Sequence, residues 1–151
     1  QILVVDLDVH QGNGTACIFQ EDDRVFTFSM HGAKNYPFKK ETSDLDIGLP
    51  DGIRDQEYLD LLEAHFFTLI EKLKPDFIFF QSGVDILETD KLGKLGVSVE
   101  GCKQRDEMVI STCFEKGIPM QISMGGGYSK EIRHIVEAHA NTFRLAKHYF
   151  D

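Results

Sequence analysis

The sequence predicts an α/β protein in which helices flank a parallel β-sheet. Short runs rich in β-branched and aromatic residues alternate with longer segments that repeat apolar residues at helical spacing. The run 77–80 is apolar throughout, which is typical of a strand buried on both faces. Acidic, imidazole or glycine residues follow each strand-like run. Because ligands of such sheets bind at the carboxyl ends of the strands, we expect the site at this edge.

Local patterns define the individual elements. Residues 55–73 carry apolar side chains three and four positions apart and precede Pro75, which predicts a helix that ends there. Gly117 marks the end of a second long helix, and Ser129 is the expected cap of the last one. Residues 33–52 are mostly polar and turn-forming, so we expect a loop. We expect strands at 2–10, 25–30, 76–81 and 119–124, and helices at 15–19, 55–73, 98–116 and from Ser129 onward.

Size, charge and cysteine content limit the class of protein. The chain has 151 residues, 42% of them hydrophobic, which fits a single globular domain. A net charge of −9 argues against nucleic acid or an acidic membrane as partner, and no apolar run approaches the roughly 20 residues of a membrane span. The three cysteines form no Cys-x-x-Cys pair, which favours a cytoplasmic protein with reduced thiols. Gln1 opens the sequence inside a strand-like run, so we expect the C-terminal part of a longer protein.

Carboxylate and imidazole groups end two of the predicted strands. Asp6, Asp8 and His10 alternate along the first strand and should project to the same side. Asp8, His10 and Asp85 can supply three ligands to a divalent metal and leave a position for water, as in catalytic metal sites. Such ligands suit zinc or iron(II), and the set alone does not separate the two. The alternative is that Asp8 and His10 only cap a helix or join a hydrogen-bond network.

A glycine run with a tyrosine, Gly125-Gly126-Gly127-Tyr128, ends the fourth predicted strand. Glycines before a helix can cradle a phosphate, but the run matches neither the P-loop nor the Gly-x-Gly-x-x-Gly pattern. The other interpretation is a backbone bend that leaves room for a substrate and directs the Tyr128 hydroxyl toward it. A phenol near a metal can donate to a developing oxyanion.

Four motifs in a fixed order resemble those of a known family. They are Val5-Asp6-Leu7-Asp8-Val9-His10-Gln11-Gly12-Asn13-Gly14-Thr15, Ser29-Met30-His31, Ser82-Gly83-Val84-Asp85-Ile86-Leu87 and Gly125-Gly126-Gly127-Tyr128. Together they resemble the zinc-dependent histone deacetylase family over essentially the whole chain. Gln11 and Asn13, with the segments 85–88 and 90–93, are most similar to the class IV branch and its bacterial relatives.

This resemblance implies a fold, an activity and a set of site residues. It implies the arginase/deacetylase fold, with residues 1–151 as the C-terminal part of a single deacetylase catalytic domain. The implied reaction is zinc-dependent hydrolysis of the amide bond of acetyl-lysine or a small acetylated amine. The implied residues are Asp8, His10 and Asp85 as zinc ligands, Tyr128 as the group that polarises the acyl carbonyl, and Gly126, Gly127 and Tyr36 at the substrate. A potassium site is implied at Asp6, Ser29 and the main-chain oxygens of Asp8, His10 and Met30.

The acid/base group of the family is a pair of adjacent histidines, and no two of the six histidines here are adjacent. The resemblance places that pair upstream of Gln1, and Asp6 and Asn13 resemble the residues that orient it. We therefore expect the parent protein to be a deacetylase and the isolated chain to be nearly inactive. We also expect the chain to associate with the absent N-terminal part or to form a homo-oligomer.

Two competing functions remain at the level of sequence. A manganese ureohydrolase shares the implied fold, but its two-metal site needs a further aspartate where this chain has Gly12. A non-catalytic module that binds acyl-lysine would keep the fold without turnover. Intact Asp8, His10, Asp85 and Tyr128 count against such a loss of catalysis.

Overall fold

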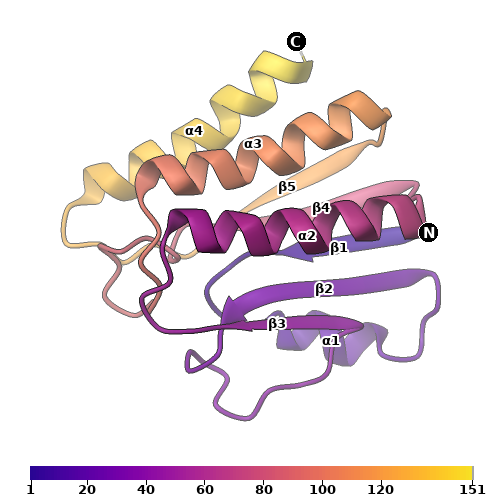
Figure 1. Cartoon of the computed structure of the whole chain (residues 1–151), viewed down its shortest axis with the longest axis horizontal. Helices are drawn as coiled ribbons and strands as arrows, with labels where there is room; N and C mark the ends of the chain where they lie inside the picture. The colour runs from indigo at the N-terminus through magenta and orange to yellow at the C-terminus, as the bar shows by residue number, and fades with distance from the viewer. Residues whose placement is uncertain (151) are drawn as a thin grey trace.

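A five-stranded parallel β-sheet forms the centre of the computed structural model, which describes residues 1–150 (Figure 1). The strand order is β3-β2-β1-β4-β5, so the first strand of the chain lies in the middle of the sheet. Every neighbouring pair of strands runs parallel, as predicted. The elements are β1 (Ile2–Asp6), α1 (Asn13–Phe19), β2 (Val25–Gly32), β3 (Leu45–Leu49), α2 (Asp55–Leu73), β4 (Phe77–Gly83), α3 (Val99–Lys116), β5 (Met120–Gly125) and α4 (Ile132–Phe150).

The two faces of the sheet are covered to different extents. Helices α2, α3 and α4 lie over one face, and the short helix α1 lies on the other side (Figure 1). In β1, Leu3 and Val5 are fully buried, whereas Ile2 and Val4 are partly exposed. The hydrophobic core therefore sits between the sheet and its long helices. It includes Leu3, Val5, Phe28, Tyr58, Leu62, Phe66, Ile78, Phe80 and Val109.

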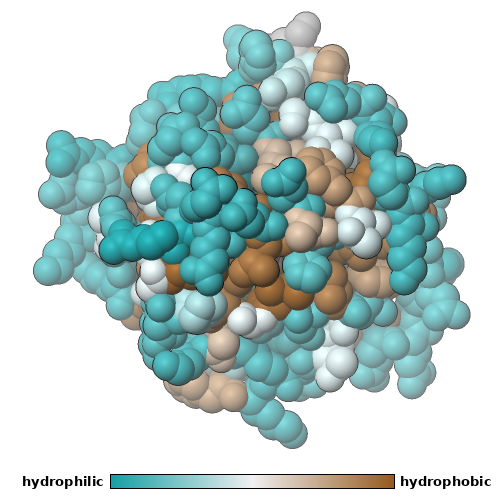
Figure 2. Space-filling model, viewed as in Figure 1, coloured by the Kyte–Doolittle hydropathy of each residue, from teal (hydrophilic) through white to brown (hydrophobic). Residues whose placement is uncertain are grey.

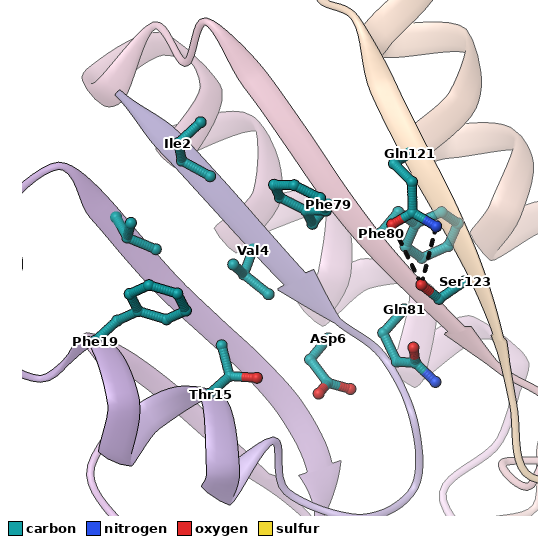
Figure 3. A pocket seen from close by; sticks show the side chains of 11 residues that line it. Ile2, Val4, Asp6, Thr15, Phe19, Phe79, Phe80, Gln81, Gln121 and Ser123 are labelled. Atoms are coloured by element: carbon teal, nitrogen blue, oxygen red, sulfur yellow. Dashed lines mark hydrogen bonds between the residues drawn. The ribbon is translucent and has the colours of Figure 1, made fainter.

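The face opposite the long helices carries an open apolar pocket of about 530 Å³. Figure 3 shows Ile2, Val4 and Phe79 side by side on neighbouring strands, with Asp6 further along β1. Phe79 is 43% exposed. The prediction that the run 77–80 is buried on both faces is therefore wrong for Phe79, because no long helix covers that side. The opposite side of the molecule, in Figure 2, is mostly hydrophilic, with apolar side chains across its middle.

Three predicted boundaries hold because local chemistry determines them. Helix α2 spans 55–73 as predicted, and Lys74 takes a left-handed conformation directly before Pro75. At the start of α3, the Ser98 hydroxyl accepts the Gly101 N–H at 2.9 Å, which is a typical N-cap. Gly117 ends this helix with φ 65°, a conformation that favours glycine.

None of the helices in residues 1–150 combines the length and hydropathy needed to cross a membrane.

Three predicted boundaries are wrong. Strand β1 ends at Asp6 rather than at position 10, because the Asp8 carboxylate accepts the His10 N–H and bends the chain. Residues 45–49, expected within a loop, form the edge strand β3 against β2. Helix α4 begins at Ile132, and the Ser129 hydroxyl pairs with the Thr89 hydroxyl at 2.7 Å instead of capping the helix.

Candidate metal centre

Two acidic residues and a histidine meet at the carboxyl edge of the sheet. Strands β1 and β4 are parallel neighbours, so the segments that follow them leave the sheet at the same edge. Asp8 and His10 lie in the turn after β1, and Asp85 lies in the loop after β4. One ligand atom from each of the three lies within 4.8 Å of the others. We call Asp8, His10 and Asp85 the ligand cluster.

Short contacts orient the side chains of the ligand cluster. His10 Nδ1 lies 2.9 Å from Asp8 Oδ1 and 3.2 Å from Asp85 Oδ2. The Val9 N–H donates to Asp85 Oδ1 at 2.9 Å. The exposed fraction of the side chain rises from 2% for Asp85 and 15% for Asp8 to 32% for His10. The cluster is therefore buried on the side of Asp85 and open on the side of His10.

Two carboxylates at this edge are costly to keep ionised. Burial raises the pKa of Asp85 to about 7, and the nearby Asp8 carboxylate contributes to the shift. Burial also raises the pKa of Asp6 to about 7, against the stabilising N–H of Asp8. A bound divalent cation would neutralise two carboxylates and remove this cost. The donor set of two carboxylates and an imidazole thus fits a metal of the zinc or iron(II) type.

Glycines bring the neighbouring backbone close to the ligand cluster. A Cβ at Gly83 would lie 2.7 Å from the Cα of Asp8, so only glycine lets the two strand ends approach this closely. A Cβ at Gly126 would lie 2.8 Å from the Cβ of Asp85, and φ is 63° there. The glycine run after β5 is therefore packed directly against a predicted metal ligand.

Comparisons with known proteins identify the family. The model of the histone deacetylase domain matches residues 1–143. The chain belongs to the histone deacetylase family. An uncharacterized protein of Picosynechococcus sp. is 48% identical over 147 residues, which are 97% of this chain and 49% of that protein. Histone deacetylase 2 of Arabidopsis thaliana is 32% identical over 139 residues, which are 90% of this chain and 36% of that protein. The chain spans about half, or less, of the length of these relatives.

Solved structures confirm the predicted arginase/deacetylase fold. The HDA15 HD domain superposes with a TM-score of 0.80 at 25% identity, covering 97% of this chain and 45% of that chain. An acetylpolyamine aminohydrolase from Burkholderia pseudomallei superposes with a TM-score of 0.80 at 19% identity, covering 97% of this chain and 44% of that chain.

Tyr128, which the family resemblance makes the carbonyl-polarising residue, follows the glycines. Its backbone N–H donates to Asp90 Oδ2 at 2.6 Å, and its side chain is 59% exposed. Asp90 Oδ1 accepts the N–H groups of Leu92 and Gly93, each at 2.8 Å. Asp90 thus ties the tyrosine segment to the loop after β4. Gly127 also has a positive φ, 109°, and a Cβ there would press on Ile135 and Val84.

The remaining expected residues of a histone deacetylase site lie around the ligand cluster in different ways. Asp6 and Ser29 are register partners on β1 and β2, and Met30 follows Ser29 in the buried part of β2. Ser29 Oγ accepts the Gly12 N–H at 3.2 Å. Asn13 is the first residue of α1. These positions are compatible with an ion beside the cluster, which stays a prediction.

Tyr36 lies on the loop between β2 and β3, outside the ligand cluster. Its ring is 61% exposed and contacts Phe38 edge to face, with ring centroids 6.3 Å apart. The neighbouring Asn35 is buried and donates from Nδ2 to the Leu92 carbonyl at 2.9 Å. The loop is therefore anchored to the segment after β4. A role for Tyr36 at the substrate remains a prediction.

Sequence reasoning gave no structural role to Asp90 or Arg105, both of which support this site. Asp90 holds the segment of Tyr128 in place. Arg105 is fully buried on α3 and donates to the carbonyls of Leu7 and Gly83, beside the two strands that lead to the ligands. A signal was present: Arg105 lies on the apolar stripe of α3 that includes Cys102 and Val109.

Proposed function

We propose that the protein containing this chain hydrolyses the amide bond of acetyl-lysine, or of a small acetylated amine, with zinc at the ligand cluster. The observation that carries the proposal is the convergence of Asp8, His10 and Asp85 within 4.8 Å at the carboxyl edge of the sheet. Membership of the histone deacetylase family supports the reaction class. The similarity to an acetylpolyamine aminohydrolase, a likeness of fold alone, keeps small acetylated amines as candidates.

The ligand cluster would hold the metal through two carboxylates and one imidazole. Their formal charge matches a divalent cation, and the exposed side of His10 leaves room for water and substrate. A zinc ion there would supply a Lewis acid for the acyl carbonyl and lower the pKa of a water molecule. Iron(II) is the alternative that the same ligands accept. A potassium ion held by Asp6, Ser29 and the main-chain oxygens of Asp8, His10 and Met30 is the second ion of the proposal.

Tyr128 would stabilise the charge that develops on the acyl oxygen. Its phenol is a hydrogen-bond donor on a segment that Asp90 fixes and that Gly126 holds against Asp85. Gly126 and Gly127 would leave space for the acyl group. The proton transfers need an acid/base pair, which the family supplies as two adjacent histidines. We infer that a segment outside this chain carries them, oriented by Asp6 and Asn13, and that the chain alone turns over little substrate.

The open face of the sheet supports a second part of the same domain as the partner. Ile2, Val4 and Phe79 form an apolar surface there, and Asp6 points into the same pocket (Figure 3). Apolar surfaces of this kind mark interaction sites. The relative that is 48% identical is about twice as long as this chain, so a homologous segment is the occupant that we propose. A stable homodimer of the isolated chain in solution would contradict that choice of occupant.

The activity is tested on the full-length protein with an acetyl-lysine peptide. We expect turnover that is removed by chelation and restored by zinc. Asp8→Asn should remove a metal ligand and abolish activity. Tyr128→Phe should lower kcat about 100- to 1,000-fold, because it deletes one oxyanion donor, and should leave zinc content unchanged.

Three results would contradict this function. Equal activity of the wild type and both variants would exclude the zinc mechanism and favour a protein that does not use this cluster. Two manganese ions per chain after purification would favour the ureohydrolase chemistry. Zinc bound tightly with no turnover of acylated lysines or amines would support a binding module.

A further inference from the structure

Arg105 is a fully buried arginine that links the long-helix layer to the catalytic edge of the sheet. It lies on α3, and its side chain has no exposed surface. Guanidinium Nη1 donates to the Gly83 carbonyl at 2.7 Å and to the Leu7 carbonyl at 3.1 Å. One donor group therefore joins two backbone oxygens, one at the end of β4 and one directly after β1. Burying a charge is costly, so its retention needs these partners.

The two carbonyls lie where the regular pairing of β1 and β4 ends. Asp6 and Gln81 are the last register partners, and Leu7 N–H donates to the Gln81 carbonyl at 3.1 Å. Leu7 directly precedes the ligand Asp8, and Gly83 lies two residues before the ligand Asp85. Beyond the last ladder bond, the Arg105 bridge spans the two segments that carry the ligands.

The guanidinium itself is held in one orientation. Arg105 Nε donates to Asp106 Oδ1 at 2.7 Å, and Asp106 Oδ2 accepts the Thr142 hydroxyl of α4 at 2.6 Å. Nη2 approaches Cys102 Sγ at 3.3 Å, and the guanidinium carbon lies 5.7 Å from the centroid of the Phe80 ring. We call Arg105, Asp106 and Thr142 the arginine cluster. It connects α3, α4, β1 and β4 through one planar group.

We propose that Arg105 is a positioning residue that sets the spacing of the metal ligands Asp8 and Asp85. This rests on the proposed function, since it needs a metal at the ligand cluster. Arg105 acts through the backbone, by fixing the Leu7 and Gly83 carbonyls. A lysine keeps the charge but lacks the planar fork that serves Asp106 and both carbonyls at once. Groups that orient metal ligands affect metal affinity without contacting the ion.

The test measures metal binding by the purified chain, with zinc and cobalt(II) as probes. The apo protein is titrated in competition with a chromophoric chelator, and the visible spectrum of the cobalt form reports ligand geometry. Arg105→Lys should lower zinc affinity about 10- to 100-fold and change the cobalt spectrum. The second variant combines Arg105→Met with Asp106→Leu, which removes the buried pair while keeping its volume. Thr142 keeps a 3.4 Å bond to the Ala138 carbonyl in that background.

A matched control separates positioning from general loss of stability. Val109→Ala removes buried apolar volume from the same stripe of α3, one turn further along, and takes no polar group from the arginine cluster. It should lower the unfolding midpoint in EDTA and change zinc affinity less than threefold. If a folded Arg105 variant binds zinc as tightly as the wild type and gives the same cobalt spectrum, the positioning role is refuted and the metal site stands. If the wild type binds neither metal, the proposed function fails, and the role of Arg105 fails with it.

Discussion

The ligand cluster and the arginine cluster are two groups of polar side chains that differ in charge balance and in burial. In the arginine cluster, the Asp106 carboxylate has a guanidinium at 2.7 Å and a hydroxyl at 2.6 Å. In the ligand cluster, Asp8 and Asp85 share one imidazole, and burial together with the nearby Asp8 carboxylate raises the pKa of Asp85 to about 7. The first is complete from residues of the chain alone. The second has two carboxylates against one imidazole, a balance of charge that suits a bound cation.

This difference helps to distinguish charged groups that hold the fold together from charged groups that bind a ligand. A buried charge that is fully paired by the protein needs no ligand, and its role is to hold neighbouring elements together. Buried acids without full compensation are retained at a cost, and such groups concentrate where a protein binds or reacts. The backbone connects the two clusters. Arg105 donates to the Leu7 and Gly83 carbonyls, which lie next to the segments that carry Asp8 and Asp85.

The largest expected effect comes from breaking the paired cluster. Arg105→Met alone leaves Asp106 buried without its cation, which should lower the free energy of unfolding by about 3–5 kcal/mol. Urea denaturation in EDTA measures this loss without a contribution from bound metal. Adding Asp106→Leu should restore most of the stability, since no buried charge then remains. If Arg105→Met lowered the free energy of unfolding by less than about 1 kcal/mol, the arginine cluster would not be a structural unit of the fold.

The opposite response is expected from the ligand cluster. Asp85→Asn removes one of two close carboxylates, so the apo chain should become more stable, by about 1 kcal/mol. The same change should weaken zinc binding at least about 100-fold. Chelator competition and urea denaturation measure the two effects on one preparation.

Asp44→Asn is the control for that comparison. The Asp44 carboxylate accepts the Thr27 N–H and hydroxyl, each at 2.8 Å, away from the ligand cluster. Its replacement should reduce stability and leave zinc affinity unchanged. An apo form that is destabilised equally by Asp85→Asn and Asp44→Asn would mean that Asp85 is an ordinary structural carboxylate.

The sequence was sufficient to predict the parallel sheet and the convergence of Asp8, His10 and Asp85 at its carboxyl edge, whereas their role as metal ligands stays a prediction. Helix α2 and the end of α3 follow from Pro75 and Gly117. Asp8 and Asp85 could be paired because parallel strands end at one edge. The distance between the two carboxylates and the position of His10 between them could not be predicted. Both depend on the turn that follows the early end of β1 at Asp6.

Other features depend on contacts between distant segments. Strand β3 exists through its pairing with β2 rather than through its own sequence, Leu45 to Leu49. The exposure of Phe79 follows from which face the helices cover, which the apolar run 77–80 does not encode. Arg105 lies 98 residues from its acceptor Leu7 in sequence, so only the fold reveals the bridge.

A smaller effect is expected from crowding the ligand cluster without changing its charge. Gly126→Ala would place a methyl group against the Asp85 carboxylate, and φ is 63° at this position. We expect about a 10-fold loss of zinc affinity and a stability loss of about 1–2 kcal/mol. Gly52→Ala is the matched control, because φ is 75° and no atom lies within 4 Å of the new Cβ. Gly52→Ala should lower stability through backbone strain alone and leave zinc affinity unchanged. Equal zinc affinity in the two variants would argue against close contact between Gly126 and Asp85 in solution.

The smallest expected effect concerns the access of solvent to Cys102, which lies beside the arginine cluster. Cys102, whose sulfur lies 3.3 Å from Arg105 Nη2, is buried, and burial raises its pKa to about 12. Burial also raises the pKa of Cys113 to about 12, whereas Cys17 is exposed. At pH 8 the thiolate fraction of the two buried cysteines is about 10⁻⁴, so a disulfide reagent should modify one thiol per native chain quickly. Mass spectrometry should locate it at Cys17, with the other two reacting only as the chain opens. Cys102 contacts the guanidinium, so its labelling rate reports whether Arg105 protects it from solvent. Faster labelling of Cys102 in Arg105→Lys than in Val109→Ala would show that the arginine itself provides this protection. Equal labelling rates would show that apolar packing provides it.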